Sequence, residues 1–346
     1  MRTTDIHTNG WTRREWLRAV AIATGGALLG PLVPREAAAV KVDVDAGTVR
    51  EIKRGRLGWT IWLELENGPF PAPGARYKDA TTAVFVPRHF RIPKDRQIDT
   101  VLHFHGHGNT VAKAFDRYEL REQVYDSRQN CILVVPQGPV NATDSCGGKL
   151  DEEGGLIRFL TEVRKTLQTK TVRKALGKAA LPANARIGTL CISAHSGGYR
   201  VTARCLQHGG YPVSEVYLFD ALYGDEVMYA DWLAATKDLH DWRRSHKLIN
   251  FYATRRPTKC SKILMKLLDE RGVAWLHEEK EGDLTRDQLC KGRAIFINSR
   301  LNHRTVVFRH NTLRDCLYAS RLDRYMGTDW FDRKKQPRRI DARTPD

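Results

Sequence analysis

Short apolar runs that alternate with helix-like stretches organise most of the chain. Runs rich in Val, Ile, Leu and Phe predict buried β-strands at residues 100–104, 131–135, 186–192, 215–219, 248–252 and 294–298. Apolar residues with helical spacing predict helices at residues 156–167, 199–207 and 260–268. Strands that alternate with helices are typical of βαβ units. The pattern therefore predicts an α/β fold, with a mainly parallel central sheet and helices on both faces.

The segments around this alternating pattern predict further parts of the fold. Residues 57–65 and 82–86 predict strands, and the turn-rich residues 67–74 between them indicate an antiparallel pair at the entry to the sheet. Residues 144–155 are polar and rich in glycine, which predicts a surface loop. Residues 225–241 predict a helical insertion that caps the functional site.

The first 39 residues have the pattern of an export signal. Arg13 and Arg14 precede Leu17, and an apolar run over residues 19–33 leads to small residues at 37–39. This arrangement resembles a twin-arginine signal peptide. The resemblance implies the twin-arginine translocase and a signal peptidase as partners during export, and a periplasmic or secreted mature protein.

Residues 40–332 are then expected to form one catalytic domain, followed by a basic, proline-containing tail at residues 333–346. The chain of 346 residues carries 57 Lys and Arg against 40 Asp and Glu, a net charge of +17. This excess favours an anionic partner such as a cell-envelope surface. The charge is diffuse, and no zinc-finger spacing or RNA-binding aromatic signature accompanies it, so we expect no nucleic acid partner.

The seven cysteines show no CxxC or Cys/His spacing of a metal site. Cys131 and Cys191 lie in apolar runs and are expected to be core thiols. Cys146, Cys260 and Cys290 have polar neighbours, and two of them are candidates for pairing in an oxidising compartment.

Ser196 lies where a predicted strand gives way to a predicted helix. Small residues stand two places before and two places after it, at Ala194 and Gly198. A serine nucleophile on a tight strand-to-helix turn needs small residues there, because larger side chains would collide with the neighbouring elements. The segment departs from G-x-S-x-G only in having alanine at its first position. We therefore predict that Ser196 is a nucleophile.

From Thr100 to Leu317 the chain resembles the α/β-hydrolase superfamily. Two motifs carry the resemblance: the strand-to-helix turn at Ser196, called the nucleophile elbow, and the His105-Gly106-His107-Gly108 turn that follows a strand. The resemblance implies an α/β-hydrolase fold and an oxyanion hole. Its donors are expected among the backbone N–H groups of Gly106, His107 and Gly108, together with that of Gly197 after the nucleophile.

Three alternating histidines, His103, His105 and His107, also invite a metal-site interpretation. The pattern runs from the strand into glycines, and no carboxylate or cysteine completes a ligand set. We favour the turn interpretation and expect neither a metal nor any other cofactor.

The remaining members of a catalytic triad follow from chain order, which in this fold is Ser, acid, His. No carboxylate directly follows the strand at 248–252, so Asp220, at the end of the preceding strand, is the predicted acid, with Asp225 and Glu226 as rivals. His303 follows the strand at 294–298 and is the predicted base. His310 is its rival, should residues 305–308 form the last strand.

Together these features predict an exported serine hydrolase that cleaves a carboxylic ester through an acyl-enzyme. The preference for an ester comes from the resemblance. Two other hypotheses stay open: a peptidase or cell-wall amidase with the same triad, and a non-catalytic binding protein on a hydrolase scaffold.

Overall fold

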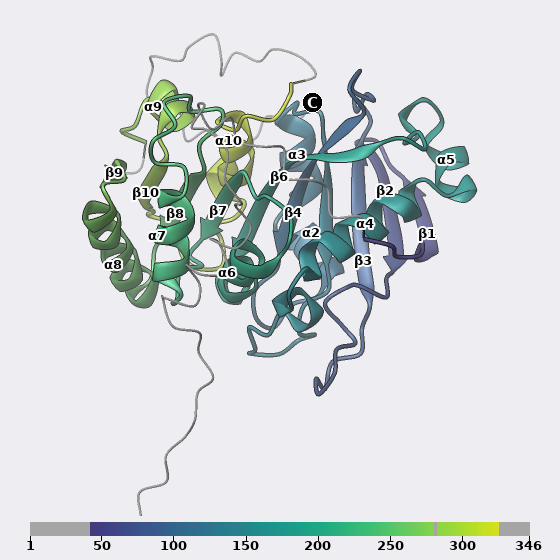
Figure 1. Cartoon of the computed structure of the whole chain (residues 1–346), viewed down its shortest axis with the longest axis horizontal. Helices are drawn as coiled ribbons and strands as arrows, with labels where there is room; N and C mark the ends of the chain where they lie inside the picture. The colour runs from purple at the N-terminus through teal and green to yellow at the C-terminus, as the bar shows by residue number, and fades with distance from the viewer. Residues whose placement is uncertain (1–41, 280–281, 325–346) are drawn as a thin grey trace, which may run out of the picture. The chain divides into compact units, whose positions relative to one another are not determined.

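A mixed β-sheet forms the centre of the computed structural model, which describes residues 42–279 and 282–324 (Figure 1). The predicted export signal and the predicted tail lie outside the described residues. Among the described residues ten strands form one sheet in the order β1-β2-β3-β5-β4-β6-β7-β8-β10-β9. Their bounds are β1 Thr48–Arg54, β2 Gly58–Glu64, β3 Thr81–Pro87, β4 Gln97–Phe104, β5 Cys131–Pro136, β6 Arg186–His195, β7 Glu215–Phe219, β8 Lys247–Tyr252, β9 Trp275–Glu278 and β10 Ala294–Asn298.

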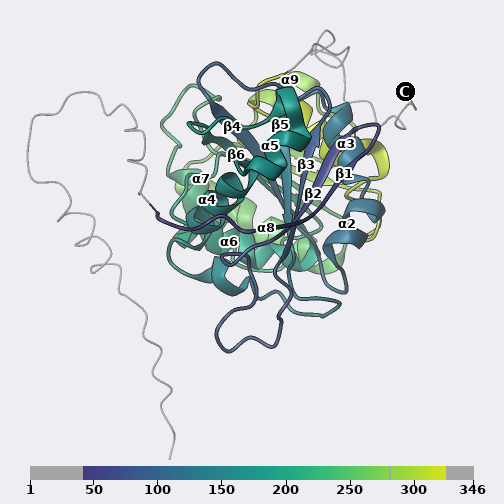
Figure 2. The same ribbon diagram turned by 90° about the vertical axis from the view of Figure 1, so that its right-hand side faces the viewer.

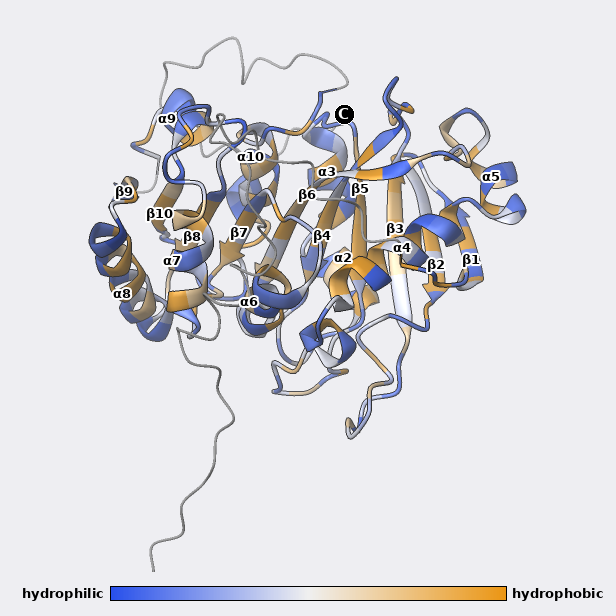
Figure 3. Cartoon of the chain, in the orientation of Figure 1, coloured by the Kyte–Doolittle hydropathy of each residue, from blue (hydrophilic) through white to orange (hydrophobic). Residues whose placement is uncertain are grey.

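Strand pairing changes from antiparallel to parallel once across the sheet. The pairs β1/β2, β2/β3 and β3/β5 are antiparallel, and the strands from β5 to β9 in sheet order are parallel to one another. Parallel strands need both faces covered, which explains why the central strands read as continuous apolar runs. Figure 3 shows hydrophobic residues along these strands, and every residue of β5 is buried.

Helices cover both faces of the sheet. Their bounds are α2 Val111–Arg117, α3 Leu120–Asp126, α4 Gly155–Leu167, α5 Lys170–Leu176, α6 Tyr199–His208, α7 Glu226–Ala234, α8 Arg255–Arg271, α9 Arg286–Lys291 and α10 Thr312–Tyr318. One apolar core includes buried residues of α4, α6, α7 and α8, and a second includes those of α2, α3, α9 and α10. Figure 2, viewed from the β1 edge, places α4 and α2 on opposite sides of the sheet. The predicted α/β-hydrolase fold is confirmed.

The strand register brings several chain reversals to one edge of the sheet. Phe104 at the end of β4 lies opposite Ala194 of β6, and His195 at the end of β6 lies opposite Phe219 of β7. In turn Phe219 lies opposite Phe251 of β8. The residues that follow β4, β6 and β7 therefore meet at the carboxyl ends of parallel strands, where ligands bind in open α/β sheets.

Two predicted features differ from the structure. Part of the expected cap insertion at residues 225–241 forms α7, which connects β7 to its parallel neighbour β8 and packs against α6 and α8. Parallel neighbours require such a crossover, so this helix belongs to the basic fold. All seven cysteines lie in the described residues and no disulfide joins any two of them, and Cys260, one of the three candidates for pairing, is buried in the core.

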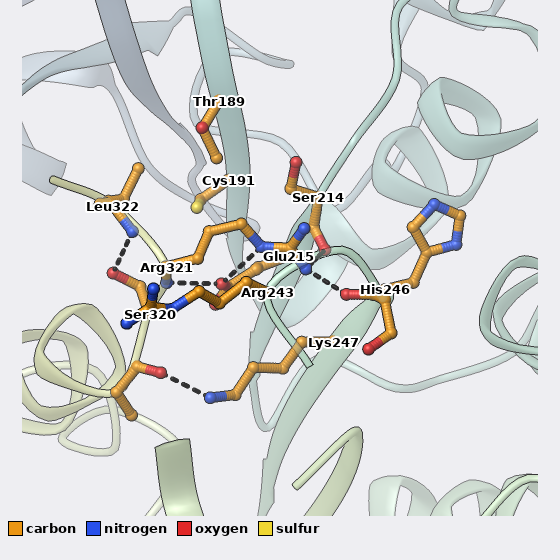
Figure 4. Close-up of polar contacts among 12 residues, drawn as sticks. Thr189, Cys191, Ser214, Glu215, Arg243, His246, Lys247, Ser320, Arg321 and Leu322 are labelled. Atoms are coloured by element: carbon orange, nitrogen blue, oxygen red, sulfur yellow. Dashed lines mark hydrogen bonds and ion pairs between the residues drawn. The ribbon is translucent and has the colours of Figure 1, made fainter. Parts of the chain in front are cut away.

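The opposite edge of the sheet anchors the end of the described chain (Figure 4). Glu215, which is 1% exposed, forms an ion pair with Arg321 at 3.2 Å. Lys247 donates to the carbonyl of Ala319 at 2.6 Å. Buried charges are tolerated only when paired and hydrogen bonded, and these contacts tie the segment after α10 to the first residues of β7 and β8.

No helix in the described part of the chain combines the length and apolarity of a membrane crossing.

Candidate active site

Ser196 occupies a strained turn between β6 and α6. Its φ is +53°, in the left-handed region that non-glycine residues rarely adopt, and it is the first residue of the short helix η3 (Ser196–Gly198). Ser196 is 7% exposed. Strain of this kind persists where the surrounding structure enforces it and is concentrated at functional sites. The backbone therefore has the geometry that the nucleophile-elbow prediction requires.

His303 and Asp220 complete a chain of hydrogen bonds with Ser196. The Oγ of Ser196 lies 2.9 Å from Nε2 of His303, and Nδ1 of His303 lies 2.6 Å from Oδ2 of Asp220. His303 comes from the loop between β10 and α10, and Asp220 directly follows β7. The structure thus brings together the three residues that the sequence predicted as a triad, in the order and at the distances that proton transfer needs.

The Asp220 carboxylate is held in place from several sides. Oδ1 accepts the backbone N–H groups of Ala253 and Thr254 at 2.8 and 3.0 Å, and Oδ2 accepts the Thr254 hydroxyl at 2.7 Å. Burial acts to raise the pKa of Asp220, but the hydrogen bonds from His303, Ala253 and Thr254 outweigh it and lower the pKa below its usual value. Asp220 is therefore an anion that orients the imidazole of His303.

The rival residues lie elsewhere. Asp225 is the N-cap residue that precedes α7, and Glu226 is the first residue of that helix. Within the described chain the carboxylate bonded to His303 is that of Asp220. Residues 305–308 form turns and no strand, so β10 is the last strand of the described chain. His310 lies on the short helix η4 (Arg309–Asn311), and the imidazole bonded to Ser196 is that of His303.

A second, buried chain of hydrogen bonds supports the backbone of His303. Nε2 of His195 donates to the His303 carbonyl at 2.8 Å, so its Nδ1 accepts the Tyr118 hydroxyl, also at 2.8 Å. The Tyr118 oxygen in turn accepts from the Asn109 side chain at 3.0 Å. Burial, reinforced by the nearby His303, lowers the pKa of His195 to about 3, which keeps it neutral. His195 is thus a positioning residue, and no sequence motif indicated Tyr118.

The turn after β4 lies against the elbow. A Cβ on Gly106 would come within 2.7 Å of Nδ1 of His195 and of Cβ of Ser196, and a Cβ on Gly197 would overlap the His107 ring. Only glycine permits these approaches. They place the backbone of Gly106, His107 and Gly197 beside the serine.

His105 orients this turn. Its Nδ1 donates to the Gly106 carbonyl at 2.9 Å, while its Nε2 accepts the N–H of Gly138 at 3.0 Å. The carbonyl of Gly106 and the N–H of His107 belong to one trans peptide and point in opposite directions. The hydrogen bond of His105 therefore fixes the direction of the His107 N–H.

Gly108 differs from the expectation for the oxyanion hole. Its N–H donates to the Ala142 carbonyl at 2.9 Å, which removes this amide from the expected donors. The N–H groups of His107 and Gly197, close to Ser196, are then the best-placed candidates.

The three alternating histidines have separate partners. His103 is fully buried and bonds to Ser193 through Nδ1 at 2.9 Å, His105 holds the turn, and Nε2 of His107 lies 2.9 Å from Oγ of Ser145. No group of three His, Cys, Asp or Glu side chains in the described residues could hold a metal ion.

A cleft opens above Ser196. Its lining includes His107, Ser145, Tyr199, Tyr223, Phe308 and the exposed Arg117 and Arg304. The predicted surface loop at 144–155 reaches the site through Ser145, whereas none of residues 225–241 lines the cleft. A cleft that has aromatic rings in its lining and a hydrogen-bonded serine at its base is typical of a binding site for an organic substrate.

No protein-family model matches the chain, and no curated protein matches its sequence. Solved structures do resemble it. A feruloyl esterase module from Clostridium thermocellum, complexed with sinapinate, is 14% identical over 82% of this chain and 92% of its own, with a TM-score of 0.43. An S-formylglutathione hydrolase from Agrobacterium tumefaciens is 14% identical over 79% and 99%, with a TM-score of 0.39. The S-formylglutathione hydrolase of Staphylococcus aureus is 10% identical over 76% and 99%, with a TM-score of 0.40.

Proposed function

We propose that this protein is a serine hydrolase that cleaves a carboxylic ester through an acyl-enzyme. The observation that carries the proposal is the hydrogen-bonded chain from Asp220 through His303 to Ser196, on a strained turn at the floor of a cleft. A serine hydroxyl is a weak nucleophile unless a neighbouring base removes its proton. In this hydrogen-bonded chain His303 is that base, and Asp220 is the acid that orients it.

The proposed reaction has two halves. In the first, His303 takes the proton of Ser196 as Oγ attacks the ester carbonyl, and the resulting oxyanion accepts hydrogen bonds from the N–H groups of Gly197 and His107. His303 then gives that proton to the leaving alcohol. In the second half His303 takes a proton from a water, which attacks the acyl-enzyme. His303 then returns that proton to Oγ of Ser196 as the acid is released. The anion of Asp220 stabilises the imidazolium in both halves, and the scheme uses no cofactor.

The resemblance to α/β hydrolases favours an ester over an amide. The proposal is tested by a panel of p-nitrophenyl esters of differing chain length, assayed beside peptide and muropeptide substrates. A fluorophosphonate probe should label the wild-type protein at Ser196 and leave Ser196→Ala unlabelled. Turnover of esters with labelling of Ser196 supports the proposal. Turnover restricted to peptides or muropeptides would favour the peptidase or amidase, and absence of labelling would favour a binding protein.

We further propose export to the periplasm or beyond, by the twin-arginine translocase and a signal peptidase. Arg13 and Arg14 support this, together with the small residues at 37–39. Replacing both arginines by lysine keeps the charge but removes the paired guanidinium groups, so the precursor should remain in the cytoplasm. Arg18→Lys is the matched control and should be exported normally. Normal export of the double variant would contradict this proposal.

A further inference from the structure

The cleft above Ser196 has an uneven distribution of charge. Its charged side chains, apart from histidines, are Arg117 and Arg304, and no carboxylate belongs to its lining. Both arginines are exposed. Within residues 42–279 and 282–324 neither guanidinium forms an ion pair with a carboxylate. The two positive charges therefore face a cleft that contains no acidic group of its own to neutralise them.

Both arginines are connected to the catalytic histidine. Arg304 directly follows His303. Burial raises the pKa of the Tyr118 hydroxyl, and the positive charge of the neighbouring Arg117 acts to lower it. That hydroxyl bonds to His195, whose ring centroid is 4.7 Å from that of His303. Arg304 is thus adjacent to His303 in the chain, and Arg117 is connected to it through Tyr118 and His195 in the lining of the same cleft.

The His303 side of the cleft faces one part of the substrate. His303 must give its proton to the leaving oxygen, so the leaving alcohol has to lie against His303. The N–H groups of Gly197 and His107, by contrast, are beside the acyl carbonyl. A charge borne by the leaving alcohol therefore lies in the part of the cleft beside His303 and its neighbour Arg304, with Arg117 in the same lining.

Asp144 is an acidic residue next in sequence to Ser145, which lines the cleft. The Asp144 carboxylate accepts the Tyr77 hydroxyl at 2.8 Å and the Cys146 N–H at 2.9 Å. Its pKa is lowered by these hydrogen bonds and by nearby arginines, although burial opposes the shift. The arginines that act on the Asp144 carboxylate are Arg76 and Arg200, and neither belongs to the lining of the cleft.

We propose that the cleft selects esters whose leaving alcohol carries an anionic group, which Arg117 and Arg304 bind. This proposal rests on the proposed ester hydrolysis. A planar guanidinium pairs well with carboxylate, sulfonate or phosphate oxygens because its N–H groups form a fixed fork. The tyrosines and Phe308 in the lining provide a surface for the organic part of the same group.

A matched pair of substrates tests the proposal. Both 4-acetoxybenzoate and its methyl ester present the same acetyl group, and only the first has an anionic leaving phenol. The methyl ester has the more electron-poor leaving group, so intrinsic reactivity favours the neutral compound. The wild-type kcat/KM should nevertheless be about tenfold higher for the anion, the effect expected of two exposed ion pairs. Most of it should lie in KM, and it should shrink as sodium chloride is raised.

Variants assign the preference to the two arginines. Arg117→Gln and Arg304→Gln should each lower the ratio of kcat/KM for the anionic over the neutral ester, and the double variant should reverse it in favour of the neutral ester. Arg173→Gln, an exposed arginine on α5 outside the cleft, is the matched control and should keep the wild-type ratio. Circular dichroism melts show whether each variant is folded.

The outcomes separate this proposal from the function on which it rests. Hydrolysis of the neutral ester that depends on Ser196, without a preference for the anion, overturns the charge selection and leaves ester hydrolysis intact. The same holds if the double variant keeps the wild-type ratio. If neither ester is hydrolysed and no p-nitrophenyl ester is cleaved, both proposals fail together.

Discussion

Replacing Asp220 by asparagine should reverse the tautomer of His303. The two backbone N–H groups of Ala253 and Thr254 both donate to Oδ1 of Asp220, so the oxygen of an asparagine would remain there. Its Nδ2 would then take the place of Oδ2, 2.6 Å from Nδ1 of His303. Two donors cannot face each other at that distance, so the imidazole must carry its proton on Nε2. That proton would point at Oγ of Ser196, and His303 could no longer accept the proton of the serine.

The size of the effect follows from this loss. A triad whose histidine has the wrong tautomer loses roughly 10⁴-fold in kcat, which corresponds to about 5.5 kcal/mol of transition-state stabilisation. KM should change little because Asp220 is fully buried and out of reach of the substrate. The protein should still fold, since the two backbone hydrogen bonds survive. The free energy of unfolding should fall by about 1–3 kcal/mol, the usual effect of losing a hydrogen bond to a buried charge.

The assay is steady-state hydrolysis of the best p-nitrophenyl ester, with urea unfolding as the measure of stability. Asp225→Asn and Glu226→Gln are the matched controls, because these are the next acidic residues along the chain and the carboxylate bonded to His303 is that of Asp220. A folded Asp220→Asn protein with kcat within about threefold of the wild type would refute the tautomer argument. If Asp225→Asn or Glu226→Gln were the severe change instead, Ser196 would keep its role and the choice of acid would be wrong.

Three further predictions concern the base and two buried groups. His303→Ala should lower kcat/KM about as much as Ser196→Ala, and the double variant should be hardly worse, whereas His310→Ala should cost far less; the reverse ranking of the histidines would transfer the role of base to His310. Tyr118→Phe should leave the buried His195 without a donor and lower the free energy of unfolding by about 1–3 kcal/mol, together with a loss of kcat; unchanged urea melts and kcat would refute this. Burial raises the pKa of Asp99 to about 6, so the folded protein keeps a proton that the unfolded chain releases. Asp99 should therefore lower stability as the pH rises from about 4 to 6, by at most about 3 kcal/mol. Asp99→Asn should flatten that slope in urea unfolding at several pH values, and an unchanged slope would contradict the burial argument.

The sheet was predictable because its strands are buried on both faces. β7 and β10 cover the residues that the apolar runs predicted, and the other predicted strands differ by a few residues at their ends. β1 escaped prediction because it is an exposed edge strand with charged residues at Arg50, Glu51, Lys53 and Arg54. β9 escaped because it has only four residues. An edge strand is defined by its partner, and its own composition carries little signal.

The elbow and the crossover helix show two different limits of sequence reasoning. A small-Ser-small pattern between strand and helix indicated Ser196, because the turn itself demands those residues. The apolar residues of α7 show no clear helical periodicity, so the sequence does not indicate a helix face that packs against the sheet. Residues 225–241 were therefore interpreted as a cap. Its true place depends on β7 and β8 being parallel neighbours, which is a property of the whole sheet.

Sequence by itself determined the class of fold, the position of the nucleophile and a short list of acids and bases. These depend on local patterns: buried strands, one tight turn and the order of elements along the chain. The tertiary structure decided which members of that list meet, since the contact of His303 with Ser196 and Asp220 joins residues 107 and 83 positions apart in the chain. It also showed the support from Tyr118 and His195, the engaged amide of Gly108 and the two arginines of the cleft. Each of these is set by strand register and helix packing, which bring distant residues within hydrogen-bond distance and leave no local mark in the sequence.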